Sequence, residues 1–226
     1  MQRRALIAGI AAAIAAPALA TPPPARAGVT RIGLADAFLL LDAYLALKPI
    51  ERDRFFLAYR AVRAGKPAPD ANARIVHRDH TSTPVTVDAA GWVTELPTLD
   101  QLKRRETFEV DGPAFDMALE LRATLAPAAR LPVSELAAAV AQVNAALLTF
   151  ADGDSSAVGQ LTCIFFPDAG AGRAILADGG ERPLPSFDFK LIGPTPYFEP
   201  RAMQQASAVA LDKSPSRILV AGRPPR

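Results

Sequence analysis

The most regular pattern of apolar and polar positions in the chain covers residues 134–150. Apolar residues recur there at steps of three and four, which places them on one face of an α-helix and leaves Gln142 and Asn144 off that face. Ser134 is the expected N-cap, with Asp152 and Gly153 as the stop. We expect strands on either side to pack against this helix. The apolar face consists of Leu136, Val140, Val143, Leu147 and Phe150.

Alternation of apolar and polar residues predicts strands before and after this helix. The clearest strand covers residues 115–125, where one face is apolar and the other is polar. A strand with one buried apolar face and one solvent-facing polar face is typical of an antiparallel, half-buried sheet rather than a parallel α/β core. Further strands are expected at residues 55–63, 73–78, 161–166, 174–177, 187–191, 206–211 and 217–221, the last two forming a closing pair around Lys213 and Pro215. For residues 55–63 a helix is the alternative, and the alternation of apolar residues favours the strand.

Two further elements are predicted in the N-terminal half. Residues 36–47 form a short helix that is expected to end at Lys48 and Pro49. Residues 83–96 form a β-hairpin with its turn at residues 88–91. Together these elements indicate an α+β fold: an antiparallel, β-rich, sandwich-like or half-barrel sheet with one central amphipathic helix and a short N-terminal helix.

The domain organisation follows from length and the N-terminal composition. Residues 1–20 have the pattern of a signal peptide: Arg3 and Arg4, an apolar stretch, and an A-x-A cleavage site at residues 18–20. A second A-x-A motif ends at residue 27, and residues 21–30 are expected to be a disordered lead-in. Residues 31–226 are expected to form a single α+β domain, or two subdomains at 31–130 and 131–226.

The signal predicts a periplasmic or secreted protein. The general secretory route is favoured, and the pair Arg3 and Arg4 leaves the twin-arginine route as an alternative. We expect no stable membrane anchor after signal cleavage, because no further segment was identified as a spanning helix and no cysteine stands at a cleavage site.

Charge and cysteine content narrow the classes of partner and site. The formal charge of +2 is due to the two signal arginines, so the mature chain is neutral and nucleic acid is not an expected partner. Cys163 is the single cysteine, which excludes an internal disulfide. Its apolar strand favours core packing, with a nucleophile paired to His77 or His80 as the alternative.

The candidate metal ligands are His77, Asp79 and His80. On a continuous strand His80 would face away from the other two, so a metal site needs a turn at this point. The alternative is an exposed strand end. Residues 152–156 have oxygen ligands spaced as in a calcium loop, but the closing glutamate is missing, which favours a helix-terminating loop.

Three aromatic residues on predicted loops are candidates for stacking on a ligand: Trp92, Tyr197 and Phe198. The alternative is that they cover the core. Phosphate-binding and dinucleotide-binding glycine motifs, the G-x-S-x-G motif of serine hydrolases and paired-cysteine metal motifs are all missing from the sequence. No cofactor is therefore expected.

Three segments carry a resemblance to a known family: residues 88–97, residues 139–144 and residues 214–219. Together they resemble a family of small exported proteins of unknown function from Gram-negative bacteria. The resemblance implies an envelope protein and assigns no catalytic residue.

The leading functional hypothesis is a soluble periplasmic protein that acts as a non-catalytic binding or envelope-support module, with an envelope component or a small ligand as its partner. The first alternative is a metal-dependent hydrolase that uses His77, Asp79 and His80. The second is a carrier of an apolar ligand, which predicts a cavity between the helix at residues 134–150 and the sheet.

Overall fold

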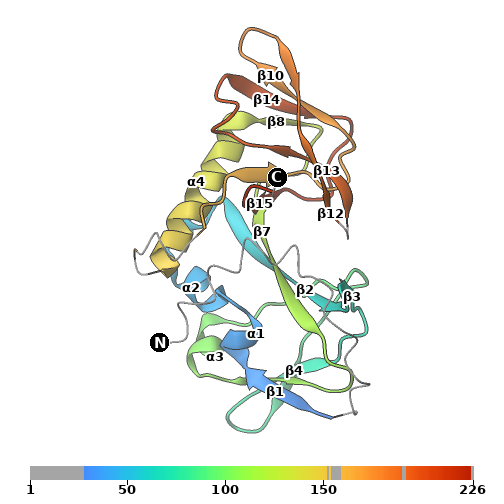
Figure 1. Cartoon of the computed structure of the whole chain (residues 1–226). Coiled ribbons are helices and arrows are strands. Elements are labelled where there is room, and N and C mark those ends of the chain that lie inside the picture. The colour runs from blue at the N-terminus through green and yellow to red at the C-terminus, as the bar shows by residue number, and fades with distance from the viewer. Residues whose placement is uncertain (1–27, 152, 154–158, 190–191, 225–226) are drawn as a thin grey trace. The chain divides into compact units, whose positions relative to one another are not determined.

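The structure is a computed structural model that describes residues 28–151, 153, 159–189 and 192–224 (Figure 1). The predicted signal peptide and most of the candidate calcium loop lie outside these residues. The predicted α+β class is confirmed: the sheets are mostly antiparallel, one is curled as a half-barrel, and there is one main helix.

The chain folds into two compact units. Unit 1 contains Pro49–Phe56 and the described residues from Glu120 onward, and unit 2 contains residues 28–48 and Leu57–Leu119. Two of the points at which the chain passes from one unit to the other lie inside strands β2 and β7, whose bounds are given below.

The helices are α1 (Leu34–Ala37), α2 (Leu41–Ala46), the 3-10 helix η3 (Pro49–Glu51), α3 (Leu99–Lys103) and α4 (Val133–Phe150). The first seven strands are β1 (Thr30–Gly33), β2 (Phe55–Arg63), β3 (Lys66–Pro67), β4 (Ala73–Val76), β5 (Ser82–Pro84), β6 (Thr107–Val110) and β7 (Asp116–Ala123). The others are β8 (Arg130–Pro132), β9 (Cys163–Phe165), β10 (Gly172–Leu176), β11 (Glu181–Pro183), β12 (Ser186–Phe189), β13 (Gly193–Phe198), β14 (Ala206–Leu211) and β15 (Leu219–Ala221).

Unit 2 contains an antiparallel sheet with the order β1-β6-β4-β5. Its core is aromatic: Phe38 makes edge-to-face contacts with Tyr59 and Phe108, at centroid distances of 5.1 and 5.7 Å. Strand β2 has the bounds that the alternation of apolar residues predicts. The predicted hairpin is present as a tight turn at Asp88, with a bridge between Val87 and Val93 in place of long paired strands.

The helix predicted at residues 36–47 is interrupted. Leu40 has a left-handed backbone, with a φ of 67°, so that α1 and α2 are separate helices. The Tyr59 hydroxyl donates a hydrogen bond to the carbonyl oxygen of Leu39 at 2.7 Å. This side-chain bond uses a carbonyl that a continuous helix would need, and it satisfies the buried phenol.

Unit 1 contains one sheet with the order β11-β10-β14-β8 and a second run of strands, β12-β13-β9-β15-β7. The predicted closing pair was wrong, because β14 pairs with β10 and β8, whereas β15 pairs with β9 and β7. Both strands are apolar at most positions, so alternation alone does not identify their neighbours.

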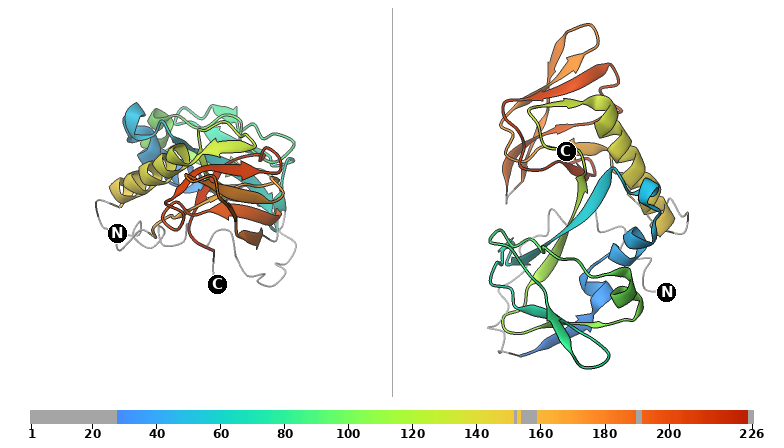
Figure 2. Two further views of the ribbon diagram at one scale, coloured as in Figure 1. Left: turned by 90° about the horizontal axis from the view of Figure 1, so that it is seen from above. Right: turned by 180° about the vertical axis from the view of Figure 1, so that it is seen from behind.

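Helix α4 packs against β8, β9, β14 and β15 of unit 1. Figure 2 shows it alongside the orange and red strands of this unit in both views. The predicted N-cap was wrong, because the helix begins at Val133 and its N-cap is Pro132, two residues before Ser134. Gly153 is at the predicted stop, with a φ of 82° and its N–H bonded to the Leu148 carbonyl. The fully buried face consists of Leu136, Ala139, Val143, Ala146 and Leu147.

Among the described residues, α4 is the one helix that is long and apolar enough to cross a membrane by length and composition, contrary to the expectation that no further segment fits. A core helix of a soluble protein passes the same test. Polar side chains of α4 bond to the segment around η3 in unit 1: Gln142 donates to the Ile50 carbonyl and to Asp53, and Glu135 forms an ion pair with Arg54.

Candidate functional site

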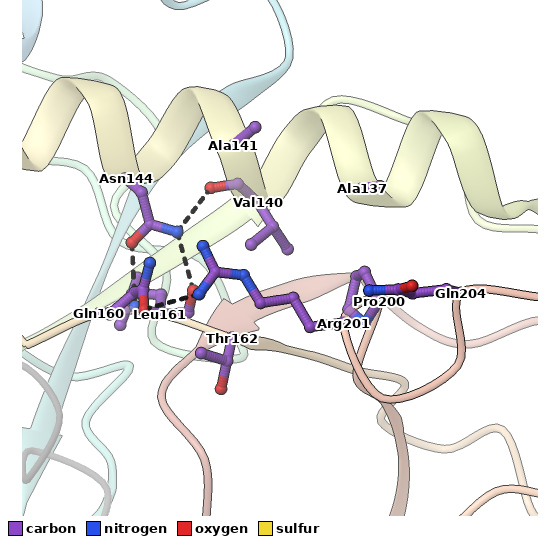
Figure 3. A pocket seen from close by; sticks show the side chains of 10 residues that line it. All are labelled: Ala137, Val140, Ala141, Asn144, Gln160, Leu161, Thr162, Pro200, Arg201 and Gln204. Atoms are coloured by element: carbon purple, nitrogen blue, oxygen red, sulfur yellow. Dashed lines mark hydrogen bonds between the residues drawn. The ribbon is translucent and has the colours of Figure 1, made fainter.

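A pocket of about 460 Å³ lies in unit 1 beside α4 (Figure 3). Three segments line it: one face of α4, the chain that leads into β9, and the loop between β13 and β14. Because this face of α4 is not the one that packs on the strands, the pocket lies outside the helix–sheet interface. The lining residues are Ala137, Val140, Ala141, Asn144, Gln160, Leu161, Thr162, Pro200, Arg201 and Gln204.

Asn144 fixes two walls of the pocket relative to each other. Its Oδ1 accepts a hydrogen bond from the backbone N–H of Leu161 at 2.9 Å, and its Nδ2 donates to the Leu161 carbonyl at 2.8 Å. Nδ2 also donates to the carbonyl of Val140 at 3.0 Å. Because one side chain satisfies both backbone groups of Leu161, the segment that enters β9 is held against α4.

Arg201 is the one charged residue among those that line this pocket. Its Nη1 donates to the Gln160 side-chain oxygen at 3.1 Å, and Figure 3 shows the guanidinium extending across the pocket below Val140. The loop that carries it is held by backbone bonds from Ala202 and Met203 to the Glu199 carbonyl. The arginine is therefore presented from an ordered turn.

A second hollow of about 380 Å³ is lined by the same loop between β13 and β14. It shares Arg201 and Gln204 with the first pocket and adds Arg182 of β11. The described residues that line the two hollows include these two arginines and neither aspartate nor glutamate. The pair of hollows is thus positively charged.

The predicted metal ligands lie in unit 2, in the turn between β4 and β5. Both ring nitrogens of His77 are occupied: Nδ1 is 2.9 Å from Glu106 Oε2, and Nε2 is 2.8 Å from Thr83 Oγ1. Asp79 accepts hydrogen bonds from Thr81, whose hydroxyl lowers the pKa of this carboxyl.

His80 is exposed and has a left-handed φ of 67°. The turn that a metal site would require is therefore present, but the side chains of His77 and Asp79 are bonded to protein groups. Within the described part of the chain, no group of three or more His, Cys, Asp or Glu side chains is arranged to hold a metal ion.

The hydroxyl, imidazole and carboxylate of Thr83, His77 and Glu106 have the order of a nucleophilic triad. A triad also needs a substrate cleft beside the hydroxyl. Neither of the two hollows described above includes any of these residues. The hydrogen bonds among these three side chains instead satisfy the Glu106 carboxylate, whose side chain is only 4% exposed. They also anchor the turn between β4 and β5.

The three candidate aromatics are distributed over both units. Trp92 is half-buried in unit 2, with the Arg60 guanidinium 4.9 Å from its ring centroid. Phe198 is fully buried in unit 1. Tyr197 is half-buried there and lies 5.3 Å from the Phe165 ring. None of the three lines either hollow.

Cys163 is fully buried in unit 1, in a cluster with Phe165, Phe189 and Leu219. Burial raises the pKa of its thiol, so the thiolate that a nucleophile requires is disfavoured. The position agrees with the predicted core packing.

The sequence analysis did not identify the residues of the pocket. Asn144 was recognised only as lying off the apolar face of the helix, and Arg182 and Arg201 are isolated arginines in loop-rich segments. One signal was available: Ala137, Val140, Ala141 and Asn144 recur at helical spacing and form a second face of α4 with small side chains.

Comparisons with known proteins add no assignment: no family model, no curated protein and no solved structure matches this chain.

Proposed function

We propose that this protein is a non-catalytic binding module that holds a small amphipathic molecule in the pocket beside α4. The pocket carries the proposal: its volume of about 460 Å³ lies in the range of small-ligand sites. Its walls combine apolar surface from Ala137, Val140 and Ala141 with a few polar groups, which is the usual composition of such a site.

The rigidity of the walls supports a binding role. Asn144 holds the Leu161 backbone by two hydrogen bonds, so the pocket does not have to be assembled when the ligand arrives. A preformed site loses less conformational entropy on binding than one that must first be ordered.

We further propose that the protein acts in the periplasm, as the basic residues and A-x-A motif of the first 20 residues suggest. Fractionation of a Gram-negative host checks this proposal. A shortened chain in the periplasmic fraction supports it, and a full-length chain confined to the cytosol contradicts it.

Titration with Nile red, a neutral apolar dye, tests the binding function. We expect saturable fluorescence enhancement at one dye per chain. Ala141 is exposed on α4 and lines the pocket, so Ala141→Trp should fill the site and abolish binding. Ser134 is exposed on the first turn of the same helix and does not line the pocket, so Ser134→Trp is the matched control and should retain binding.

Unchanged dye binding in Ala141→Trp would place the dye elsewhere and refute the assignment of the pocket. No saturable binding by the unmodified protein would refute the proposed function for ligands of this kind.

A further inference from the structure

We propose that the pocket selects amphipathic molecules with an anionic head group, such as a fatty carboxylate or an alkyl sulfate, and that Arg201 and Arg182 bind this head. The inference rests on the proposed binding function and adds the charge of the ligand. Three observations support it.

The first observation is the charge of the lining. Arg201 lies at the boundary of the two adjoining hollows, and Arg182 lines the second one. The other polar side chains that line the hollows are neutral: Asn144, Gln160, Thr162, Gln204 and Gln205. A ligand carboxylate or sulfate can accept hydrogen bonds from a guanidinium in a bidentate arrangement, whereas an ammonium head would be repelled.

The second observation is that the nearby acids are paired with other arginines. Glu181, next to Arg182 in β11, lies 3.0 Å from Arg173. Glu199, two residues before Arg201, lies 3.6 Å from Arg223, and its side chain is only 15% exposed. These acids therefore do not neutralise the two arginines at the hollows.

The third observation is the bonding of the arginines themselves. Among the described residues, the hydrogen bond of Arg201 is to the neutral amide of Gln160. No side-chain hydrogen bond or ion pair joins the Arg182 guanidinium to another described residue. Both guanidinium groups thus keep donors available for a ligand anion.

The apolar part of the ligand follows from α4. The small-residue face from Ala137 to Asn144 spans about 10 Å at the helical rise per residue, a length that roughly an eight-carbon chain covers. With its head at Arg201, such a chain can lie along Val140 and Ala141. Eight-carbon probes that differ only in the head group are therefore matched to the pocket.

Calorimetric titration of the full protein with octanoate, octyl sulfate, octylammonium and octanol tests the inference. We expect the two anions to bind at least about tenfold more tightly than octylammonium, a ratio that corresponds to about 1.4 kcal/mol. The preference should decrease as the salt concentration rises, because exposed charges are screened.

Arg201→Gln and Arg182→Gln should each reduce the preference for anions, and Nile red binding is the check that the pocket is intact, which we expect to be retained in Arg182→Gln because this residue lines only the second hollow. Arg130 is also exposed and belongs to unit 1, but it lines neither hollow, so Arg130→Gln is the control for the same change in net charge. If Arg201→Gln loses dye binding, the affinities of Arg182→Gln for the anionic and cationic probes test the charge preference instead.

Equal affinity for octanoate and octylammonium in a protein that still binds Nile red would overturn this inference and leave the binding function standing. The same applies if Arg130→Gln lowers the preference as much as the two pocket substitutions. Failure to bind both the dye and all four probes would instead refute the binding function.

Discussion

Two sets of charged residues, one in each unit, lie in different environments. In unit 2, Glu109 is buried on β6, an inner strand of its sheet, directly opposite Arg31 on one neighbouring strand and Arg74 on the other, and forms ion pairs with both. In unit 1, Arg182 and Arg201 are exposed at two hollows whose described lining contains no acid.

This difference separates structural charges from charges available to a ligand. A buried carboxylate is tolerated only when it is paired and hydrogen-bonded, and Glu106 and Glu109 both meet this condition. Exposed arginines beside a hollow carry no such constraint, so the fold gains little from them. His77 is the partner of the buried Glu106 carboxylate and therefore belongs with the structural charges of unit 2.

The largest effect is expected from removing a structural charge in unit 2. Glu106→Ala leaves the His77 ring without its buried partner and should lower the free energy of unfolding by about 2 kcal/mol, the value of a hydrogen bond to a charged group. Glu95→Ala, at an exposed position of the same unit, should change it by less than about 0.5 kcal/mol. Urea denaturation measures both, and equal effects would break the comparison.

An intermediate loss of folding stability is expected when the pH is lowered. The hydrogen bond from Arg31, with a further one from Arg74, lowers the pKa of Glu109 in the folded protein. The stability that this group contributes is therefore fully present above the pKa of an unfolded glutamate, about 4.3, and is lost as the pH falls through the lower folded value.

Urea unfolding between about pH 6 and pH 2 should show this loss, and Glu109→Gln should flatten the decrease. Asp116→Asn, at an exposed acid of β7, is the control. An identical pH dependence in the unmodified protein and in Glu109→Gln would show that the ion pairs contribute nothing to folding.

The smallest effect on stability is expected at the hollows of unit 1. Arg182→Gln and Arg201→Gln should each change the free energy of unfolding by less than about 0.5 kcal/mol, because both side chains are exposed. The same urea experiment measures the change. A loss above about 1 kcal/mol would make the arginines structural and remove the contrast between the units.

Several elements could be predicted from residue patterns because a local regularity determines them. The alternation in residues 55–63 predicts β2 with its bounds, since every second side chain must be buried. Helix α4 and its stop at Gly153 follow equally from spacing and turn chemistry. Helix α3 was missed, although the Thr98 and Gln101 capping box was visible in the sequence.

Features that depend on partners distant in sequence could not be predicted. The interruption at Leu40 accompanies a hydrogen bond from Tyr59, and the separate pairing of β14 and β15 depends on strands β7 to β10. The pocket has the same origin: Asn144 and Leu161 are 17 residues apart and become neighbours only in the folded unit.

By itself the sequence determined the α+β class, the positions of its most regular elements and the packing of Cys163 in the core, because burial of apolar side chains imposes a short-range period on the chain. The tertiary structure decided which strands pair, which charges are compensated and where a hollow forms. These properties depend on contacts between side chains from segments that are far apart in the sequence. The short-range spacing of apolar residues contains no information about such contacts.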